Sequence, residues 1–327
     1  MSIKKWMLPE GVEEALPPTS WQLEDLRRKL LDQFRKRGYE LILPPLIEHL
    51  DALLTGTAQE LDASTFKFTD PASGRLLGLR SDMTPQAARI AARRFRDQDV
   101  VRLCYLGTVL RAQPDTLGGP RSPRQVGCEI FGEAGIEADL EVIDLMLRTL
   151  KLAGVKQTYL DLGHVGIYRA VSEKLALDPG DEAVLFGILQ RKSQPDLVEF
   201  AAARSLKPRI AKVFAELMEL NGDVSVLQRA RETLKPAGAN VQVALDTLEQ
   251  VVKKLRADAP KLPIHIDLAE LRGYRYHTGM VFAAFAAGHG REIARGGRYD
   301  GVGAEFGVAR PATGFSADLN ELLRLAQ

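Results

Sequence analysis

The sequence predicts an α+β fold in which one β-rich domain, residues 1–327, carries a helical insertion at about residues 171–259. Short strand-like apolar runs occur on both sides of that insertion, and helical periodicities separate some of them. Within the insertion the sequence becomes rich in Leu, Ala, Glu, Lys and Arg and is broken by proline and glycine. Because strand-like runs resume after it, the segment is predicted to interrupt the domain.

The first predicted element is an amphipathic helix in "TSWQLEDLRRKLLDQFRKRG". Its apolar residues recur at helical spacing, at Leu23, Leu26, Leu30 and Phe34. Thr19 and Gln22 have the spacing of a capping box, and Gly38 suits the position after the last turn. A strand, "YELILPP", follows and ends at paired prolines, which suits an edge.

Further strands are predicted at residues 75–80, 100–111, 124–132, 157–163, 264–271, 279–285 and 292–297. Two helices separate some of these strands. One begins at Thr84, with Pro85 in the first turn, and the other covers about residues 137–153 before Gly154.

Composition excludes several classes of protein. With 44 Lys and Arg against 43 Asp and Glu, the net charge of +1 provides no global basic field for nucleic acid, although a local basic groove stays possible. Two cysteines, Cys104 and Cys128, are too few for a disulfide framework or a cysteine-rich metal site. No apolar run approaches the roughly 20 residues that span a bilayer, so a soluble cytoplasmic protein is expected. We expect no metal and no cofactor.

The strand "RQVGCEIFG" provides the first candidate site. Alternation places Gln125, Gly127 and Glu129 on one face. Glycine would leave a hollow between an amide and a carboxylate, where a small polar ligand could lie. The alternative is a half-exposed strand with an ordinary solvent face.

Three other stretches carry candidate residues. In "LRSDMTPQ", Asp82 and Thr84 precede a helix and either bind an ammonium group or cap the helix. Arg111 ends a strand before a Gly/Pro-rich loop, which suits either an anionic ligand or a solvated hairpin. "LRGYRYHTG" gathers arginines, tyrosines and His277, without the spacing of a metal site. In "GGRYDG" the glycines indicate a hairpin turn or the wall of a pocket.

Read in order, these motifs resemble the catalytic domain of class II histidyl-tRNA synthetases over nearly the whole chain. The matching segments are "LPEGVEEALPPTSWQLEDLRRKLLDQFRKRGYELILPPLIE", "LRSDMTPQ", "YLGTVLRAQP" with "RQVGCEIFG", "LRGYRYHTGMVF" and "GGRYDG". The resemblance implies a class II synthetase-like, mostly antiparallel sheet flanked by helices. It also implies that "GGRYDG" is one wall of a histidine pocket.

The resemblance assigns a histidine-binding role to a set of residues. Asp82 and Thr84 stand where the family holds the amino group, although the family usually has glutamate in place of Asp82. Gln125 is a second amino-group contact, Glu129 an imidazole contact, and Arg272 meets the carboxylate, or carboxylate and phosphate together. The remaining predicted members are Arg111, at the arginine that touches the α-phosphate, Tyr276 and His277, at the paired tyrosines, and Tyr299.

Departures from the synthetase pattern point to a loss of catalysis. Glu321 stands where the third motif supplies the arginine that stacks on ATP, which places an anion beside a polyphosphate. Gln113 and Arg275 replace a glutamate and an aspartate of the family. The chain also ends at Gln327, where no anticodon-binding domain is expected to follow.

This pattern is similar to the regulatory subunits of ATP phosphoribosyltransferase, which are non-catalytic paralogues of the synthetase. That family implies a hetero-octamer of four regulatory and four short-form catalytic chains, a self-dimer through the first helix and strand, L-histidine as ligand, and no tRNA or membrane partner. Arg111 keeps open the alternative of a minimal enzyme that adenylates histidine or a similar amino acid.

Overall fold

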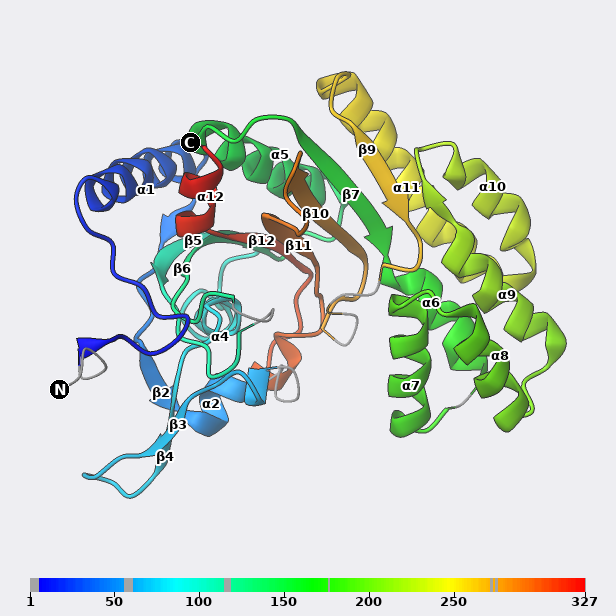
Figure 1. Ribbon diagram of the computed structural model, residues 1–327, viewed down its shortest axis with the longest axis horizontal. Helices are drawn as coiled ribbons and strands as arrows, with labels where there is room; N and C mark the ends of the chain where they lie inside the picture. Colours follow the sequence, from blue (N-terminus) through cyan, green and yellow to red (C-terminus); the bar gives the residue numbers. More distant parts are fainter. Residues whose placement is uncertain are drawn as a thin grey trace. The chain divides into compact units, whose positions relative to one another are not determined.

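The structure, a computed structural model, describes residues 6–55, 61–114, 119–175, 177–270, Gly273 and 276–326 (Figure 1). The chain forms two compact units. The first comprises residues 1–134, 144–156 and 300–327, and the second comprises residues 135–143 and 157–299. Each unit has its own strands and helices.

The sheet of the first unit has the strand order β1-β5-β6-β12. These strands are β1 (Glu40–Leu41), β5 (Val101–Thr108), β6 (Arg124–Phe131) and β12 (Ala312–Asp318). β1 runs parallel to β5, and the other two pairings are antiparallel. The register sets Tyr105 opposite Gly127, and Glu129 opposite Gly314. A side chain of β6 therefore has fixed neighbours from β5 and β12 on the same face.

Helices and a small sheet complete the first unit. Helices that lie wholly in this unit are α1 (Thr19–Lys36), α2 (Leu50–Leu54), α4 (Thr84–Arg94), α12 (Leu319–Leu325) and the 3-10 helix η4 (Ala304–Phe306). The small antiparallel sheet has the order β2-β4-β3, from β2 (Ile47–His49), β3 (Lys67–Thr69) and β4 (Leu76–Leu79). α1 buries the four apolar residues expected from its periodicity.

The predicted capping box of α1 is wrong. No side chain caps this helix, whose N-cap residue is Pro18. The backbone N–H of Ser20 instead donates to the carbonyl of Leu16, and those of Trp21 and Gln22 donate to the carbonyl of Pro18. Backbone carbonyls thus satisfy the first turn. The predicted end is confirmed, because Gly38 follows the helix with a φ of +79°.

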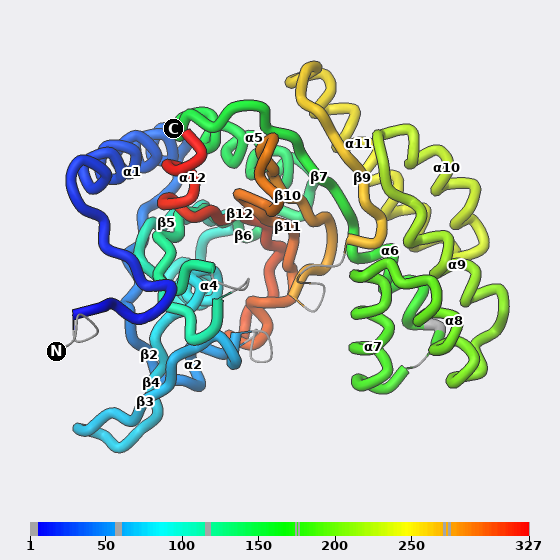
Figure 2. Tube along the Cα trace, viewed as in Figure 1, coloured from blue at the N-terminus to red at the C-terminus, as the bar shows by residue number. Residues whose placement is uncertain are grey.

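The sheet of the second unit has the order β11-β10-β7-β9-β8. It contains β7 (Thr158–His164), β8 (Asn221–Gly222), β9 (Ile264–Asp267), β10 (Met280–Ala286) and β11 (Ala294–Arg298). β7 and β9 are parallel, while the other pairings are antiparallel. Its buried face includes Leu160, Leu162, Ile264 and Ile266. α11 packs against β7 and α6 (Figure 2).

Helices follow one another between β7 and β9. They are α6 (Val165–Ser172), η2 (Glu173–Leu175), α7 (Pro179–Gln190), α8 (Gln194–Ala203), α9 (Pro208–Glu219), α10 (Val226–Thr233), η3 (Lys235–Ala237) and α11 (Ala239–Asp258). α5 (Ile136–Ala153) contributes its first residues to this unit and the rest to the other. The boundaries predicted for one domain with an insertion stay a prediction.

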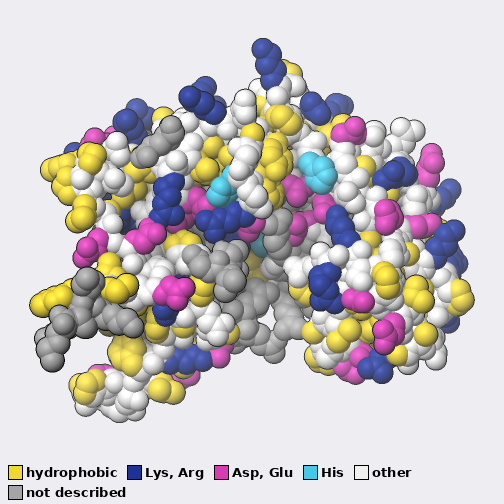
Figure 3. Space-filling model, viewed as in Figure 1, with side chains coloured by type: hydrophobic (Ala, Val, Ile, Leu, Met, Phe, Trp, Pro, Cys, Tyr) yellow, Lys and Arg dark blue, Asp and Glu magenta, His cyan; other side chains and the backbone are white. Residues whose placement is uncertain are grey.

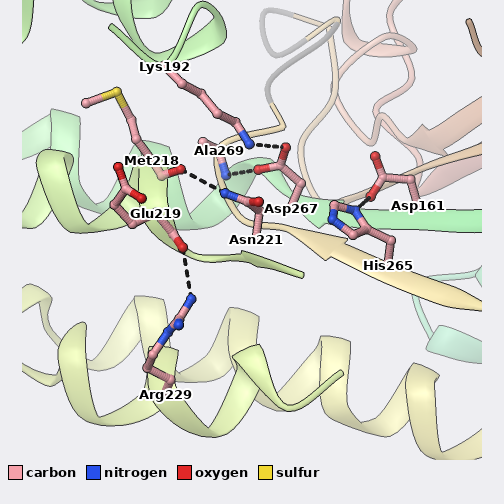
Figure 4. A network of polar contacts seen from close by, with 9 residues as sticks. All are labelled: Asp161, Lys192, Met218, Glu219, Asn221, Arg229, His265, Asp267 and Ala269. Carbon is pink, nitrogen blue, oxygen red and sulfur yellow. Dashed lines mark hydrogen bonds and ion pairs between the residues drawn. The ribbon is translucent and has the colours of Figure 1, made fainter. Parts of the chain in front are cut away.

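Polar contacts attach these helices to the sheet edge at β8 and β9 (Figure 4). Lys192, after α7, contacts Asp267 at 2.7 Å, and the Asp267 carboxylate also accepts the N–H of Ala269. His265 on β9 pairs with Asp161 on β7 at 2.9 Å. Burial raises the pKa of Asp161, and the bond from His265 opposes that rise. The ion pair of Lys192 thus joins the end of α7 to β9.

Candidate functional site

Asp82 lies between β4 and α4 and is held by two N–H groups. The backbone N–H of Thr84 donates to its Oδ1 at 2.8 Å, and the Nε2 of Gln125 donates to the same oxygen at 3.0 Å. The Oε1 of Gln125 accepts the N–H of Met83 at 2.8 Å. Asp82 therefore bonds the backbone at the start of α4, although the N-cap residue of this helix is Met83 and has no side-chain cap bond. Asp82 is also joined to the polar row of β6 through Gln125.

A second chain of bonds joins Thr84 to Glu129 through Tyr105. The oxygens of Thr84 and Tyr105 lie 3.1 Å apart, and the Tyr105 hydroxyl donates to Oε1 of Glu129 at 2.8 Å. Tyr105 is fully buried and Glu129 is 1% exposed. Burial, followed by the charges of Glu129 and Asp82, raises the pKa of Tyr105 well above its ordinary value. Tyr105 is therefore a neutral donor at every physiological pH.

Two glycines give this cluster its room. A Cβ at Gly127 would lie 2.5 Å from the carbonyl oxygen of Phe315 and 2.7 Å from the Tyr105 hydroxyl oxygen. A Cβ at Gly314 would collide with the Glu129 carboxylate, so that carboxylate lies over Gly314. The space predicted above Gly127 exists, but the Tyr105 side chain fills it, so the prediction that a ligand lies there is wrong. The alternative of a solvent-exposed face is also wrong, since Gln125 and Glu129 are both buried.

The arginines around the 112–124 loop are engaged with the protein. Arg121 donates from Nε to the carbonyl of Arg111 at 3.0 Å, and its guanidinium lies 5.2 Å from the centre of the Phe66 ring. Arg124 donates to Oδ1 of Asn320 at 3.1 Å. Residues 115–118 lie outside the described residues. Arg111 is half-buried at the end of this strand pair, bonded through its backbone to Arg121.

The second unit places three other predicted residues together. The rings of Tyr276 and Tyr299 stack at 4.7 Å, and the Tyr276 ring meets that of His277 edge-on at 5.3 Å. A Cβ at Gly297 would lie 2.7 Å from His277 Cδ2, so this glycine makes room for the imidazole. Arg272, predicted to meet a carboxylate, lies outside the described residues.

Arg298 in "GGRYDG" has a structural partner that the sequence did not indicate. Its side chain pairs with Asp139 in the first turn of α5 at 3.0 Å, and it donates to the carbonyl of Gly135. Both side chains of the pair are buried. The hairpin turn predicted at the paired glycines is wrong, because Gly296 and Gly297 lie in strand β11. Gly297 makes room for His277, Arg298 pairs with Asp139, and the Tyr299 ring stacks on Tyr276.

Comparison with known proteins gives the family. The profile of the histidyl-tRNA synthetase family matches residues 11–322. The ATP phosphoribosyltransferase regulatory subunit of Methylococcus capsulatus is 53% identical over 322 residues, which are 98% of this chain and 79% of that protein. The chain belongs to the family of ATP phosphoribosyltransferase regulatory subunits.

Solved structures of this family group share the fold. An ATP phosphoribosyltransferase regulatory subunit/histidyl-tRNA synthetase from Bacillus halodurans C has a TM-score of 0.87 at 26% identity, covering 100% of this chain and 84% of that one. The ATP phosphoribosyl transferase complex from Thermotoga maritima gives a TM-score of 0.66 at 17% identity, covering 90% of this chain and 96% of that one, a likeness of fold alone. The predicted class II synthetase-like α+β fold is confirmed.

In this regulatory-subunit chain, the start of α12 is acidic. Asp318 accepts the N–H groups of Arg124 and Asn320, each at 3.0 Å, and burial raises the pKa of its carboxyl. Glu321 follows in the first turn of α12. The described residues contain no group of three His, Cys, Asp or Glu side chains that could hold a metal ion. Nor does the described part of the chain contain a helix that could cross a membrane.

The cluster of Asp82, Thr84, Gln125 and Glu129 suits a ligand that donates hydrogen bonds. Its two carboxylates and its hydroxyl present acceptor oxygens, which match an ammonium group and a ring N–H. Sequence reasoning missed Tyr105, Asp139 and the role of Arg298. The signal for Tyr105 was its place opposite Gly127, which becomes visible only when strands 100–111 and 124–132 are paired.

Proposed function

We propose that this chain is the non-catalytic regulatory subunit of an ATP phosphoribosyltransferase, the first enzyme of histidine biosynthesis, and that it works in the cytoplasm. The observation that carries the proposal is 53% identity to a regulatory subunit over 98% of the chain. The acidic first turn of α12 supports it, because the Glu321 carboxylate would repel the phosphates of ATP.

The ligand that we propose is L-histidine. Asp82 and Thr84 would hold its ammonium group, with Gln125 fixing Asp82, and Glu129 would accept a hydrogen bond from its imidazole N–H. The contacts of Arg111, Tyr276, His277 and Tyr299 with the ligand belong to the same proposal, as does that of Arg272 with the carboxylate. Support comes from the buried acceptors around Thr84 and Glu129.

Calorimetric titration with L-histidine tests this site. Glu129→Gln replaces a buried acceptor by a partial donor, so we expect the affinity to fall by about 2 kcal/mol or more. Glu133→Gln is the matched control, because Glu133 lies four residues beyond Glu129 and pairs with Arg102. Equal histidine affinity in the wild type and Glu129→Gln would contradict the proposal.

The proposed partner is the short-form catalytic chain, in a hetero-octamer of four plus four, with no tRNA. Self-association through the first helix and strand is supported by exposed apolar residues there, among them Leu16, Trp21, Leu41 and Leu43. Figure 3 shows exposed hydrophobic side chains at the left edge of the view, as at other places on this face. Such exposed apolar surface is typical of protein interfaces.

Mixing with short-form ATP phosphoribosyltransferase tests the partner. We expect light scattering after size exclusion to show one larger assembly, and we expect a higher catalytic rate that histidine inhibits. Two separate peaks together with an unaltered rate at micromolar concentrations would refute the regulatory role. The alternative, a minimal histidine-adenylating enzyme favoured by Arg111, predicts histidine-dependent exchange of pyrophosphate into ATP. We expect no exchange above a blank without protein.

A further inference from the structure

The bond chain from Thr84 to Glu129 has a single direction. An ionised carboxylate only accepts, so the Tyr105 hydroxyl proton is directed to Glu129. Tyr105 has one proton to give, and therefore the Thr84 hydroxyl is the donor in the 3.1 Å bond between the two hydroxyls. Thr84 consequently faces a ligand as an acceptor, and Oε1 of Glu129 accepts the Tyr105 hydroxyl.

The surroundings hold Tyr105 in this role. Its hydroxyl lies over Gly127, where a Cβ would come within 2.7 Å of it, and its side chain has no exposed surface. Glu129 is confined in turn by Gly314 and by the strand pairing. In a buried network of this kind, loss of one member alters the geometry of the others.

We propose that Tyr105 is a positioning residue that makes the two ends of the ligand site depend on each other. This inference rests on the proposed function, in which Thr84 faces the ammonium group of histidine and Glu129 faces its ring. Removing the Thr84 hydroxyl leaves the Tyr105 oxygen without its donor and loosens Tyr105. The Glu129 carboxylate then loses its fixed orientation, although Thr84 does not face the ring.

The test uses a ligand that lacks the ammonium group, 3-(imidazol-4-yl)propionate. If Thr84 acted on the ammonium alone, Thr84→Val would leave the affinity for this ligand unchanged. We expect instead that Thr84→Val weakens it about 3- to 10-fold, the effect of one lost hydrogen bond. Thr84→Ser, which keeps the hydroxyl, should restore the wild-type affinity. In a Tyr105→Phe background, Thr84→Val should have no further effect.

Each result of these titrations either supports or overturns the proposed coupling through Tyr105. Equal affinity for imidazolylpropionate in wild type and Thr84→Val, or the same loss with and without Tyr105→Phe, overturns the coupling while histidine binding stands. Failure of the wild type to bind L-histidine overturns the proposed function and this inference together.

Where imidazolylpropionate binds too weakly to titrate, L-histidine itself is used in a double-mutant cycle of Thr84→Val and Glu129→Gln. The interaction between the two changes should vanish with Tyr105→Phe, and its persistence overturns the proposal. Far-UV circular dichroism of each variant establishes that it is folded.

Discussion

His164 is expected to make the second unit sensitive to acid. It ends β7 and caps α6, where its Nδ1 accepts the N–H of Gly166 at 3.1 Å. Burial, the largest cause, lowers its pKa from 6.5 to about 4. The folded chain thus takes up a proton less readily than the unfolded chain. Stability is full above pH 6.5 and is lost as the pH falls toward 4, by about 3 kcal/mol in total for this pKa difference.

The measurement is the free energy of unfolding in urea, followed by far-UV circular dichroism at pH 7.5, 6 and 5. His164→Asn keeps an oxygen that can accept the N–H of Gly166 but does not titrate. Between pH 7.5 and pH 5, the wild type should lose about 2 kcal/mol more than this variant. His289→Asn, in the turn after β10, is the control and should behave as the wild type. Parallel curves for wild type and His164→Asn would refute the reasoning.

Two further predictions concern the packing around the Glu129 carboxylate and around the ion pair of Asp139 and Arg298. Gly314→Ala forces a methyl group into the Glu129 carboxylate, so calorimetry should show at least about a 10-fold loss of histidine affinity, a loss of about 1.4 kcal/mol. Gly301→Ala, which meets only open space, is the control, and an equal affinity in both variants would be contrary to this account. Asp139→Leu leaves Arg298 charged and buried, and should destabilise the protein by about 3 to 5 kcal/mol in urea unfolding. Adding Arg298→Met should recover much of that stability, and no recovery would show that the loss had another cause.

Elements were predictable from sequence where local pattern determines them. The periodicity of residues 19–36 gave α1, and the apolar runs gave β5, β6, β7, β9 and β10 within a few residues. β12 was missed, because its sequence "ATGFSAD" is poor in large apolar residues. Its smallest residue, Gly314, is required by the Glu129 carboxylate on the neighbouring strand. That requirement is a property of strand pairing, so no local pattern in residues 312–318 expresses it.

The candidate site, too, was predictable only where a local pattern or the family resemblance indicated its residues. Alternation along one strand placed Gln125 and Glu129 on a common face, and the family resemblance added Asp82 and Thr84. The hydrogen bonds show these four residues gathered around α4 and β6. Tyr105 was not found because its role depends on the register of β5 against β6. The sequence alone also could not show that Glu129 is buried, since one strand does not reveal what covers its polar face.

The register of β12 bears on the proposed function, in which the chain binds histidine and does not adenylate it. Asp318 is paired directly with Gln125, so the acidic start of α12 adjoins the polar row of β6. Polyphosphate at this end would meet Asp318 and Glu321 in a partly buried setting, where repulsion between like charges is stronger than in water. Arg124, the cation on β6, donates from its side chain to Asn320 and from its backbone N–H to the Asp318 carboxylate. A cationic or neutral donor near Thr84 and Glu129 meets no such repulsion, because the acceptors there attract it. Under the proposed function, the same sheet face would favour an amino acid at one end and disfavour a nucleotide at the other.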